Sequence, residues 1–548
     1  MRNLVACMLL FGSALSAADL GGTWMMEQAG RGGSQVRKTY YYFKVDGNAF
    51  TGQMVSSTDN RKVQNGKIEG DTITFETQGA FNDRPNQMRA QFNGDELTIS
   101  GVGGRGGRGG PGGPPPAGAV AGRGPAGVAI QGAVAIGGAG AAGAPPAGRG
   151  PGGGRGNFTP PVFKKISDVA AIPADLLPTH KPLPPVHALP PNNLALTPPM
   201  GWNSWNKFAG RVDDKSVREM ADAIASSGMR DAGYVYVNID DTWEAGRDAS
   251  GNIQSNEKFP DMKALADYVH SKGMKLGIYS GPGRLTCAGY TASYGHEDQD
   301  ARTWAAWGID SLKYDWCAAS GVYNKEEHAP AYQKMGMALR AAGRPIVYSL
   351  CQYGWLDVGE WGASVGGNLW RTTGDIRDAW DSMANIGFAQ NGREKYASPG
   401  HWNDPDMLEI GNGGMTDTEY RTHMSLWSML AAPLLAGHDV RAMSDAIKGI
   451  LLNKEVIAID QDKAGHQGVR VRRDGEMEVW KKPLASGVAV ALFNRSKDAA
   501  KITVKWSEVG ITKNNPKIRD LWAHKDVKSP AAFTAEVPSH GVVMLKVN

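Results

Sequence analysis

Between Met200 and Asp462 the chain repeats one unit, in which a short apolar segment is followed by a polar residue and then by an amphipathic helical pattern. This alternation is typical of a parallel sheet that is covered by helices. Eight apolar segments occur, which is the number that closes a (β/α)8 barrel. In chain order they read MGWNSW, YVYVNIDD, MKLGIYS, DSLKYDWC, PIVYSLCQ, NLWRTTGD, HWNDPDML and APLLAGHD. The sequence therefore predicts a TIM barrel in this part of the chain.

The segment from Lys215 to Met229 is a representative helix of this pattern. Its apolar side chains recur at helical spacing on one face, and they are Val217, Met220, Ala221 and Ile224. Asp213 or Asp214 precedes the first turn, where a carboxylate can accept hydrogen bonds from free backbone N–H groups. We interpret the segment as a barrel helix whose apolar face packs on the sheet.

On either side of the barrel region, apolar and polar residues alternate, which indicates antiparallel strands. Turn signals such as Asp46-Gly47-Asn48 and Asn93-Gly94-Asp95 separate the N-terminal runs, as hairpins require. The predicted fold is therefore multidomain. Its parts are a signal peptide at 1–18, a small antiparallel β-domain at 19–100 with 161–168 as a candidate last strand, a disordered Gly/Ala/Pro-rich segment at 101–160, a Pro-rich linker at 169–195, the (β/α)8 catalytic barrel at 196–464 and an antiparallel β-sandwich at 465–548.

The first residues have the pattern of a secretory signal, because Arg2 is followed by an apolar run from Leu4 to Leu15 and by small residues up to Ala18. We therefore expect the mature protein to be secreted or periplasmic. No later run has the ~20 consecutive apolar residues that a membrane helix needs, so we expect no membrane contact once the signal is removed. The chain has 59 basic and 55 acidic residues, a balance that argues against nucleic acid as its main partner.

Carboxylates occur where the predicted barrel strands end, and they are Asp240, Asp241, Asp315, Asp375 and Asp406. The carboxyl ends of barrel strands point into one mouth, so we expect these side chains to converge there. Cleavage of a glycosidic bond needs one carboxylate at the anomeric carbon and a second that protonates the leaving oxygen and then activates water. The alternative interpretation is that an individual carboxylate only caps a loop or a helix.

Tryptophans gather around the same strand ends, either as platforms for sugar rings or as core residues, and they are Trp202, Trp205, Trp243, Trp316, Trp370 and Trp402. His401 is the histidine expected near the mouth, and a single imidazole is a poor metal site. We therefore expect no metal ion and no organic cofactor. Carboxylates and aromatic rings together favour a neutral carbohydrate as the substrate.

The motifs MGWNSW, NIDDTW, KLGIYS, LTCAGY, LKYDWC, WRTTGDI and HWNDPDM, in this order and spacing, resemble those of glycoside hydrolase family 27, which contains α-galactosidases and α-N-acetylgalactosaminidases. The resemblance runs from about Leu196 to Asp462 and continues into the C-terminal β-domain. It implies that Asp315 is the nucleophile and Asp375 the general acid/base of a retaining mechanism. It also implies that Lys313 and Arg371 contact the sugar.

The same resemblance implies the groups that recognise the substrate. Asp240 and Asp241 are expected to bind the axial 4-hydroxyl and the 6-hydroxyl of the sugar, and the complete pair favours a hexose over β-L-arabinopyranose. The remaining implied contacts are Trp205 as a stacking platform, Tyr279, Cys351, Gln352 and Asp406 beside the acid/base.

Three cysteines remain after the signal, and their spacing alone does not decide which two form a bridge. The resemblance implies a disulfide between Cys287 and Cys317, with Cys351 left free. The sequence departs from many members of the family at this last position, since Cys351-Gln352-Tyr353 stands where they have Cys-Glu-Trp. In the family this loop contacts the substituent on C2, so the change bears on which sugar is accepted.

We therefore expect a retaining exo-glycosidase that hydrolyses terminal α-D-galactosyl residues of oligo- or polysaccharides through a covalent glycosyl-enzyme. One alternative is a glycosidase of the same scaffold with another specificity, such as an α-N-acetylgalactosaminidase or a β-L-arabinopyranosidase. The other is a non-catalytic carbohydrate-binding protein, which loss of a catalytic aspartate would indicate. Both Asp315 and Asp375 are present.

Overall fold

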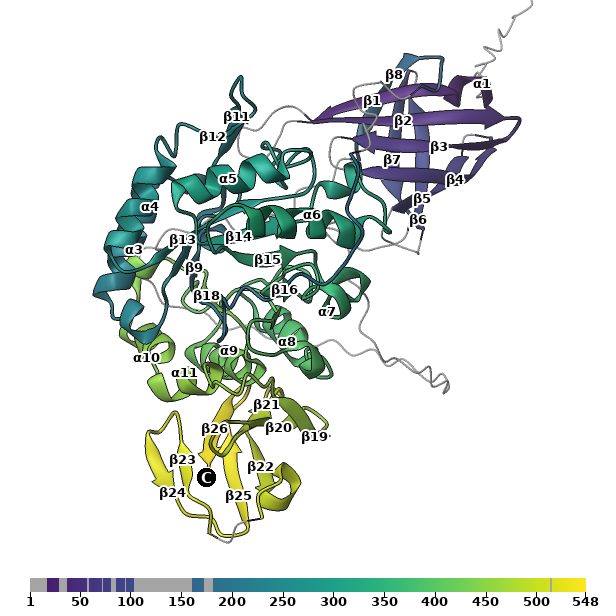
Figure 1. The fold of residues 1–548 in the computed structure, drawn as a ribbon. Coiled ribbons are helices and arrows are strands. Elements are labelled where there is room, and N and C mark those ends of the chain that lie inside the picture. The colour runs from purple at the N-terminus through teal and green to yellow at the C-terminus, as the bar shows by residue number, and fades with distance from the viewer. Residues whose placement is uncertain are drawn as a thin grey trace, which may run out of the picture.

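The computed structural model describes residues 17–28, 37–56, 59–70, 72–79, 85–93, 95–102, 160–171, 181–512 and 515–548. The predicted signal peptide, apart from Ala17 and Ala18, and nearly all of the Gly/Ala/Pro-rich segment lie outside these residues. Within them the chain forms a closed β-barrel, a (β/α)8 barrel and a β-sandwich, which confirms the predicted fold class. The small barrel and the sandwich lie on separate sides of the (β/α)8 barrel (Figure 1).

The N-terminal unit is a closed antiparallel barrel of eight strands that pair in chain order. After the short helix α1 (Ala17–Leu20), its strands are β1 (Gly22–Gln28), β2 (Arg37–Asp46), β3 (Ala49–Ser56), β4 (Asn60–Glu69), β5 (Thr72–Gly79), β6 (Asn86–Asn93), β7 (Glu96–Gly101) and β8 (Val162–Ser167). β8 pairs with both β7 and β1 and so closes the barrel. Alternate side chains fill the interior, among them Trp24, Tyr41, Phe43, Phe75 and Phe163.

The central unit is a parallel sheet of eight short strands. In chain order they are β9 (Met200–Asn203), β10 (Tyr236–Asn238), β13 (Lys275–Ser280), β14 (Ser311–Asp315), β15 (Val347–Cys351), β16 (Leu369–Arg371), β17 (Trp402–Asp404) and β18 (Leu434–Ala436). From β9 to β17 each strand pairs with the next along the chain, and β18 pairs with β9. A bridge between Leu408 and Ala436 joins the segment after β17 to β18 and closes the barrel.

Helices cover this sheet from outside (Figure 1). They are α2 (Trp205–Phe208), α3 (Asp214–Ser226), α4 (Met262–Ser271), α5 (Glu297–Trp307), α6 (His328–Ala341), α7 (Val358–Trp361), α8 (Trp380–Phe388), α9 (Asp417–Leu430), α10 (Asp445–Leu451) and α11 (Lys454–Asp460). The hairpin β11 (Glu244–Arg247) and β12 (Ile253–Ser255) is inserted after β10. In α3, Asp213 caps the first turn by accepting from the Ser216 N–H, and the four predicted apolar residues are the buried ones.

The C-terminal unit packs a six-stranded antiparallel sheet against a two-stranded one. The larger sheet contains β19 (Val469–Asp474), β20 (Met477–Pro483), β21 (Val488–Asn494), β23 (Ile518–Asp520), β24 (Lys525–Val527) and β26 (Val542–Val547). The smaller sheet contains β22 (Ala500–Lys505) and β25 (Ala532–Val537). β20, β21 and β26 contact α9 of the barrel, so the two units share buried surface.

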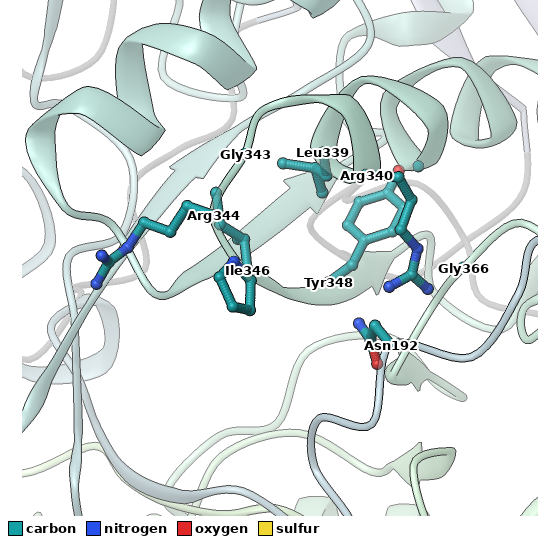
Figure 2. Close-up of a pocket in the computed structure, with 10 residues that line it drawn as sticks. Asn192, Leu339, Arg340, Gly343, Arg344, Ile346, Tyr348 and Gly366 are labelled. Carbon is teal, nitrogen blue, oxygen red and sulfur yellow. The ribbon is translucent and has the colours of Figure 1, made fainter.

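A pocket of about 240 Å³ lies at the foot of the barrel, where β15 and β16 begin. It is lined by the end of α6, the turn before β15 and Asn192 of the segment that leads into the barrel. Figure 2 shows Arg340 and Asn192 facing each other across it, while Arg344 points away toward its partner Asp310. The pocket is at the opposite end of the strands from the predicted carboxylates, so it is not the predicted active site.

Among the described residues, none of the helices combines the length and apolar character needed to cross a bilayer.

Lys482 of β20 is buried where the sandwich meets the barrel. Its Nζ donates to the carbonyl oxygens of Ser428 at 2.9 Å and Ile459 at 2.7 Å. Burial raises the pKa of the neighbouring Asp460 carboxyl to about 8, and the positive charge of Lys482 opposes this rise. The lysine therefore satisfies two helix-end carbonyls and balances a buried acid in one place.

We predict that Lys482→Met lowers the free energy of unfolding by ~3 kcal/mol or more, because breaking a buried pair leaves Asp460 and two carbonyls uncompensated. Adding Asp460→Leu should recover part of the loss. Thermal denaturation followed by circular dichroism measures both effects, and Lys481→Met, which changes the adjacent and less buried lysine, is the matched control. Equal midpoints for the two single variants would contradict the assignment.

Candidate active site

The predicted carboxylates follow strands whose carboxyl ends meet at one mouth of the barrel. Asp240 and Asp241 come after β10, Asp315 is the last residue of β14, Asp375 follows β16 and Asp406 follows β17. The strands that carry Asp315 and Asp375 flank β15 on its two sides. The site is therefore spread over four strand ends, of which only those of β16 and β17 are adjacent in the sheet.

Asp315 is almost fully buried, with 7% of its surface exposed. Its Oδ1 accepts a hydrogen bond from the Tyr353 hydroxyl at 2.7 Å and another from the Cys317 N–H at 3.0 Å. Its Oδ2 has no hydrogen-bond partner among the residues that the structure describes. Burial raises the pKa of Asp315, while the positive charge of Lys313 and the Tyr353 hydrogen bond oppose the rise. One oxygen of this carboxylate is thus fixed and the other is open to react.

Lys313 forms an ion pair with Asp240, and its positive charge also acts on Asp315. Its Nζ lies 2.8 Å from Asp240 Oδ2 and 5.3 Å from the centre of the Tyr279 ring. Asn203, at the end of β9, donates to the same Asp240 oxygen at 2.9 Å. Although burial disfavours a charged lysine, the acids around it, Asp240 first, hold the pKa of Lys313 well above its usual value. The lysine therefore stays positive beside Asp315.

Asp241 faces a different neighbour from Asp240. Its Oδ2 accepts from the Ala288 N–H and its Oδ1 from the Thr242 N–H, both at 2.7 Å. Burial raises the pKa of Asp241 to about 7. Because Ala288 directly follows Cys287, the paired aspartates are tied to the loop that carries the first half-cystine.

Arg371, at the end of β16, is the second cation of the mouth and is buried, whereas Lys313 is partly exposed. One terminal nitrogen contacts Asp375 at 3.1 Å and Asp406 at 3.0 Å, and the other lies 3.8 Å from the Cys351 sulfur. The two acids differ in exposure, since the Asp375 side chain is 72% exposed and that of Asp406 only 6%. Asp406 also accepts from the Ile376 N–H at 2.8 Å, which fixes the backbone next to Asp375.

The remaining predicted contacts differ in their access to the mouth. Trp205 begins α2 and is partly exposed, whereas Tyr279 is buried beside Lys313. Cys351 and Gln352 are both buried, and the Gln352 amide donates to the Arg371 carbonyl at 3.0 Å. The Gln352 Oε1 has no protein partner among the described residues. Gln352 therefore supports the end of β16 as well as the loop that it belongs to.

The tryptophans are mainly core residues, which is one of the two interpretations given above, whereas the expected position of His401 near the mouth is wrong. Five of the six tryptophans are core residues with 1% or less of their surface exposed, namely Trp202, Trp243, Trp316, Trp370 and Trp402. Four of them fill the space between strands and helices, while Trp402 packs with Tyr236, Val347 and Leu369 at the foot of the barrel. Among the six, Trp205 therefore remains the platform candidate. His401 lies at the foot of the barrel, since it precedes β17 and its Nδ1 lies 3.0 Å from the Gly367 carbonyl. In the described part of the chain, the one cluster with metal-ligand atoms in reach contains Cys287 and Cys317, whose sulfurs form a disulfide.

Three residues of the mouth were not predicted from the sequence. Asn203 and Asp404 are the last residues of β9 and β17, so the rule that found Asp315 would also have found them. Burial raises the pKa of Asp404 to about 6, and Arg371 opposes this rise. Tyr353 lies outside any strand, and no periodic pattern indicates that its hydroxyl reaches Asp315.

The disulfide joins Cys287 to Cys317, as the resemblance implied, and Cys351 is a buried free thiol. The bridge closes a loop of 30 residues. It joins the loop after β13, whose Ala288 N–H contacts Asp241, to the turn after Asp315. Cys317 also supplies the N–H that fixes Asp315 Oδ1. The bridge therefore restrains both sides of the mouth.

A (β/α)8 barrel whose mouth gathers a buried carboxylate, an exposed carboxylate and two cations that pair with acids has the architecture of a glycoside hydrolase. Comparisons with known proteins define the class further. A family described as "Alpha galactosidase A" matches residues 197–462, and "Alpha galactosidase C-terminal beta sandwich domain" matches residues 474–547. The chain belongs to the α-galactosidase family, glycoside hydrolase family 27, and is a glycoside hydrolase of the α-galactosidase type.

Individual relatives agree with this assignment. An α-galactosidase of Cyamopsis tetragonoloba is 49% identical over 360 residues, which are 64% of this chain and 86% of the relative. An α-N-acetylgalactosaminidase of Gallus gallus is 40% identical over 392 residues, which are 64% of this chain and 94% of the relative. The crystal structure of α-galactosidase I from Mortierella vinacea superimposes with a TM-score of 0.62 at 38% identity, covering 65% of this chain and 98% of that one.

We predict that Cys287→Ser/Cys317→Ser lowers the free energy of unfolding of the catalytic unit by roughly 3 to 4 kcal/mol, because the open loop regains conformational entropy in the unfolded chain. Differential scanning calorimetry with and without dithiothreitol provides the test. Reductant should lower the wild-type midpoint and leave that of the double variant unchanged. A wild-type protein that does not respond to reductant, with a double variant of equal stability, would show that the bridge contributes nothing.

Proposed function

We propose that this protein hydrolyses terminal α-D-galactosyl residues of oligo- or polysaccharides with retention of the anomeric configuration. Asp315 acts as the nucleophile and Asp375 as the general acid/base. The observation that carries this proposal is the contrast between the two carboxylates. Asp315 is 7% exposed and has one unbonded oxygen, whereas the Asp375 side chain is 72% exposed. Their charges interact, since Asp375 raises the pKa of Asp315.

The contrast suits the two steps of a retaining mechanism. In the first step Asp315 Oδ2 attacks the anomeric carbon while Asp375 gives its proton to the leaving oxygen, so a covalent glycosyl-enzyme forms and the aglycone departs. In the second step Asp375 takes a proton from water, the water oxygen attacks the same carbon, and the bond to Asp315 breaks. An exposed acid/base can exchange protons with solvent between these steps, and a buried nucleophile is shielded from it.

Recognition of the sugar is assigned to the buried polar groups around Asp315. Asp240 and Asp241 bind the axial 4-hydroxyl and the 6-hydroxyl, because carboxylates held by Lys313 and by backbone N–H groups retain free acceptor positions. Trp205 forms the stacking platform. Lys313, Tyr279, Cys351, Gln352, Arg371 and Asp406 complete the assigned contacts. In this assignment the unpartnered Gln352 Oε1 accepts from the substituent on C2.

We also propose that the protein acts outside the cytoplasm, either secreted or in the periplasm. The apolar run from Leu4 to Leu15 supports this, as does the disulfide, since such bridges persist in oxidising compartments.

We predict that Asp315→Ala lowers kcat for 4-nitrophenyl α-D-galactoside by about 10⁴-fold or more, since no other group can form the intermediate. Asp375→Ala should still form the intermediate from this activated substrate but should hydrolyse it slowly, because no general base activates the water, and added azide should restore turnover. The azide product identifies each role by NMR, with α-galactosyl azide expected from Asp375→Ala and β-galactosyl azide from Asp315→Ala. Asp381→Ala, which removes an exposed carboxylate from α8, is the control and should retain full activity. Substantial turnover by Asp315→Ala would overturn the assignment.

We predict that kcat/KM is highest for the α-D-galactoside in a panel with the α-N-acetylgalactosaminide and the β-L-arabinopyranoside. The arabinopyranoside lacks the 6-hydroxyl assigned to the pair Asp240 and Asp241, and a buried polar group left unpaired should cost about tenfold or more. Initial rates of 4-nitrophenol release give the order. A preference for either competitor would move the protein to another specificity of the same scaffold.

A further inference from the structure

The loop after β15 brings a tyrosine hydroxyl to the carboxylate assigned as the nucleophile. Tyr353 is buried, its hydroxyl donates to Asp315 Oδ1 at 2.7 Å, and the same hydroxyl lies 3.8 Å from the sulfur of Cys287. Its ring packs against Trp355 with the centroids 5.4 Å apart. The side chain is thus held at three points, one of which is the reactive group itself.

The backbone of this loop is strained. Tyr353, Leu356 and Asp357 have φ values of 63°, 53° and 48°, in the left-handed region that side chains other than glycine rarely adopt. Gly354 between them has φ 79°, and an added Cβ would meet the Thr372 carbonyl oxygen at 2.2 Å. Strain of this kind persists only where the surroundings fix the conformation, and it clusters at functional sites. Here it turns the Tyr353 ring from the strand end toward Asp315.

We propose that Tyr353 is a positioning residue for Asp315, whose Oδ1 it holds so that Oδ2 faces the anomeric carbon. The inference rests on the proposed function of Asp315. With the Cys317 N–H on the same oxygen, two donors from different loops restrict rotation of the carboxylate. Both donors also stabilise the charge that returns to the carboxylate when water releases the sugar. The hydroxyl is therefore expected to affect turnover more than substrate binding.

Other titratable groups also face Asp315, and they determine how its ionisation responds. They are Lys313 on the same strand, Tyr279 on β13, Tyr332 on α6, Cys351 on β15 and Asp375 after β16. Lys313 favours the ionised carboxylate and Asp375 disfavours it. The Tyr353 hydrogen bond acts in the same direction as Lys313. Its removal should therefore raise the pKa of Asp315 and move the loss of activity at low pH toward higher pH.

The test compares Tyr353→Phe with Tyr348→Phe. Tyr348 is also a buried tyrosine of the β15 region, but its hydroxyl donates to the Tyr332 carbonyl at 3.1 Å and reaches no carboxylate. Both variants lose one buried hydroxyl, so a general loss of packing or stability should affect them alike. The measurements are kcat, KM and kcat/KM for 4-nitrophenyl α-D-galactoside across pH, with thermal midpoints for both variants.

We expect Tyr353→Phe to lower kcat about tenfold or more without raising KM, and to move the acid limb of kcat/KM upward by about one pH unit. Tyr348→Phe should keep the wild-type profile. A Tyr353→Phe profile that overlays the wild type, or that changes only as Tyr348→Phe does, would overturn the inference. Wild-type turnover is measured first, because its absence would contradict the proposed function itself, whereas an active wild type with an unaffected variant contradicts only the role of Tyr353.

Discussion

A carboxylate that is removed from water needs a cation or hydrogen-bond donors close by, and the mouth of this barrel removes several carboxylates from water at once. Lys313 and Arg371 meet this need from β14 and β16. Lys313 pairs with Asp240 and favours the ionised form of Asp315, while Arg371 contacts Asp406 and Asp375. Arg371 is itself buried and Lys313 largely so, and each of these charges is therefore stable there only beside its partners of opposite sign. The arrangement of the acidic side chains therefore depends on the two basic side chains, Lys313 and Arg371.

The depth of each acid follows from its place relative to the end of its strand. Asp315 is the last residue of β14, and there the neighbouring strands and the loop after β15 cover it. Asp375 lies beyond the end of β16, four positions after Arg371, which reaches along the backbone to contact it. β14 thus places one carboxylate where it is shielded from water, and the segment after β16 places the other where it is exposed to water. A difference of a few residues in the distance from the strand end is enough to distinguish a carboxylate suited to nucleophilic attack from one suited to proton transfer.

Much of this could be predicted from the sequence, because periodicity and strand ends are local signals. The apolar face of α3 and its Asp213 cap follow from spacing, and the strand-end carboxylates follow from the geometry of parallel barrels. Trp202 and its four buried counterparts show the limit of this reasoning, since a tryptophan near a barrel strand can lie in the helix layer or at the foot of the barrel as readily as in the mouth. The position of Tyr353 depends on a left-handed backbone that no composition signal marks. The expected position of His401 is wrong because the residue precedes β17 instead of following a strand.

The way in which the N-terminal barrel closes determines which residues set the distance between this barrel and the catalytic barrel. β7 ends at Gly101 and β8 begins at Val162, yet the two strands pair side by side. The chain therefore leaves the small barrel and returns to it before it continues to the catalytic unit. The residues between β7 and β8 are an insertion within the small barrel and do not connect it to the catalytic unit. Only the stretch from Ser167 to Met200 joins the two bodies covalently. Doubling the length of such an insertion adds only about 0.6 kcal/mol of closure entropy. The segment between β7 and β8 can therefore vary in length, or accept an inserted sequence, without changing the length of chain that connects the small barrel to the catalytic unit.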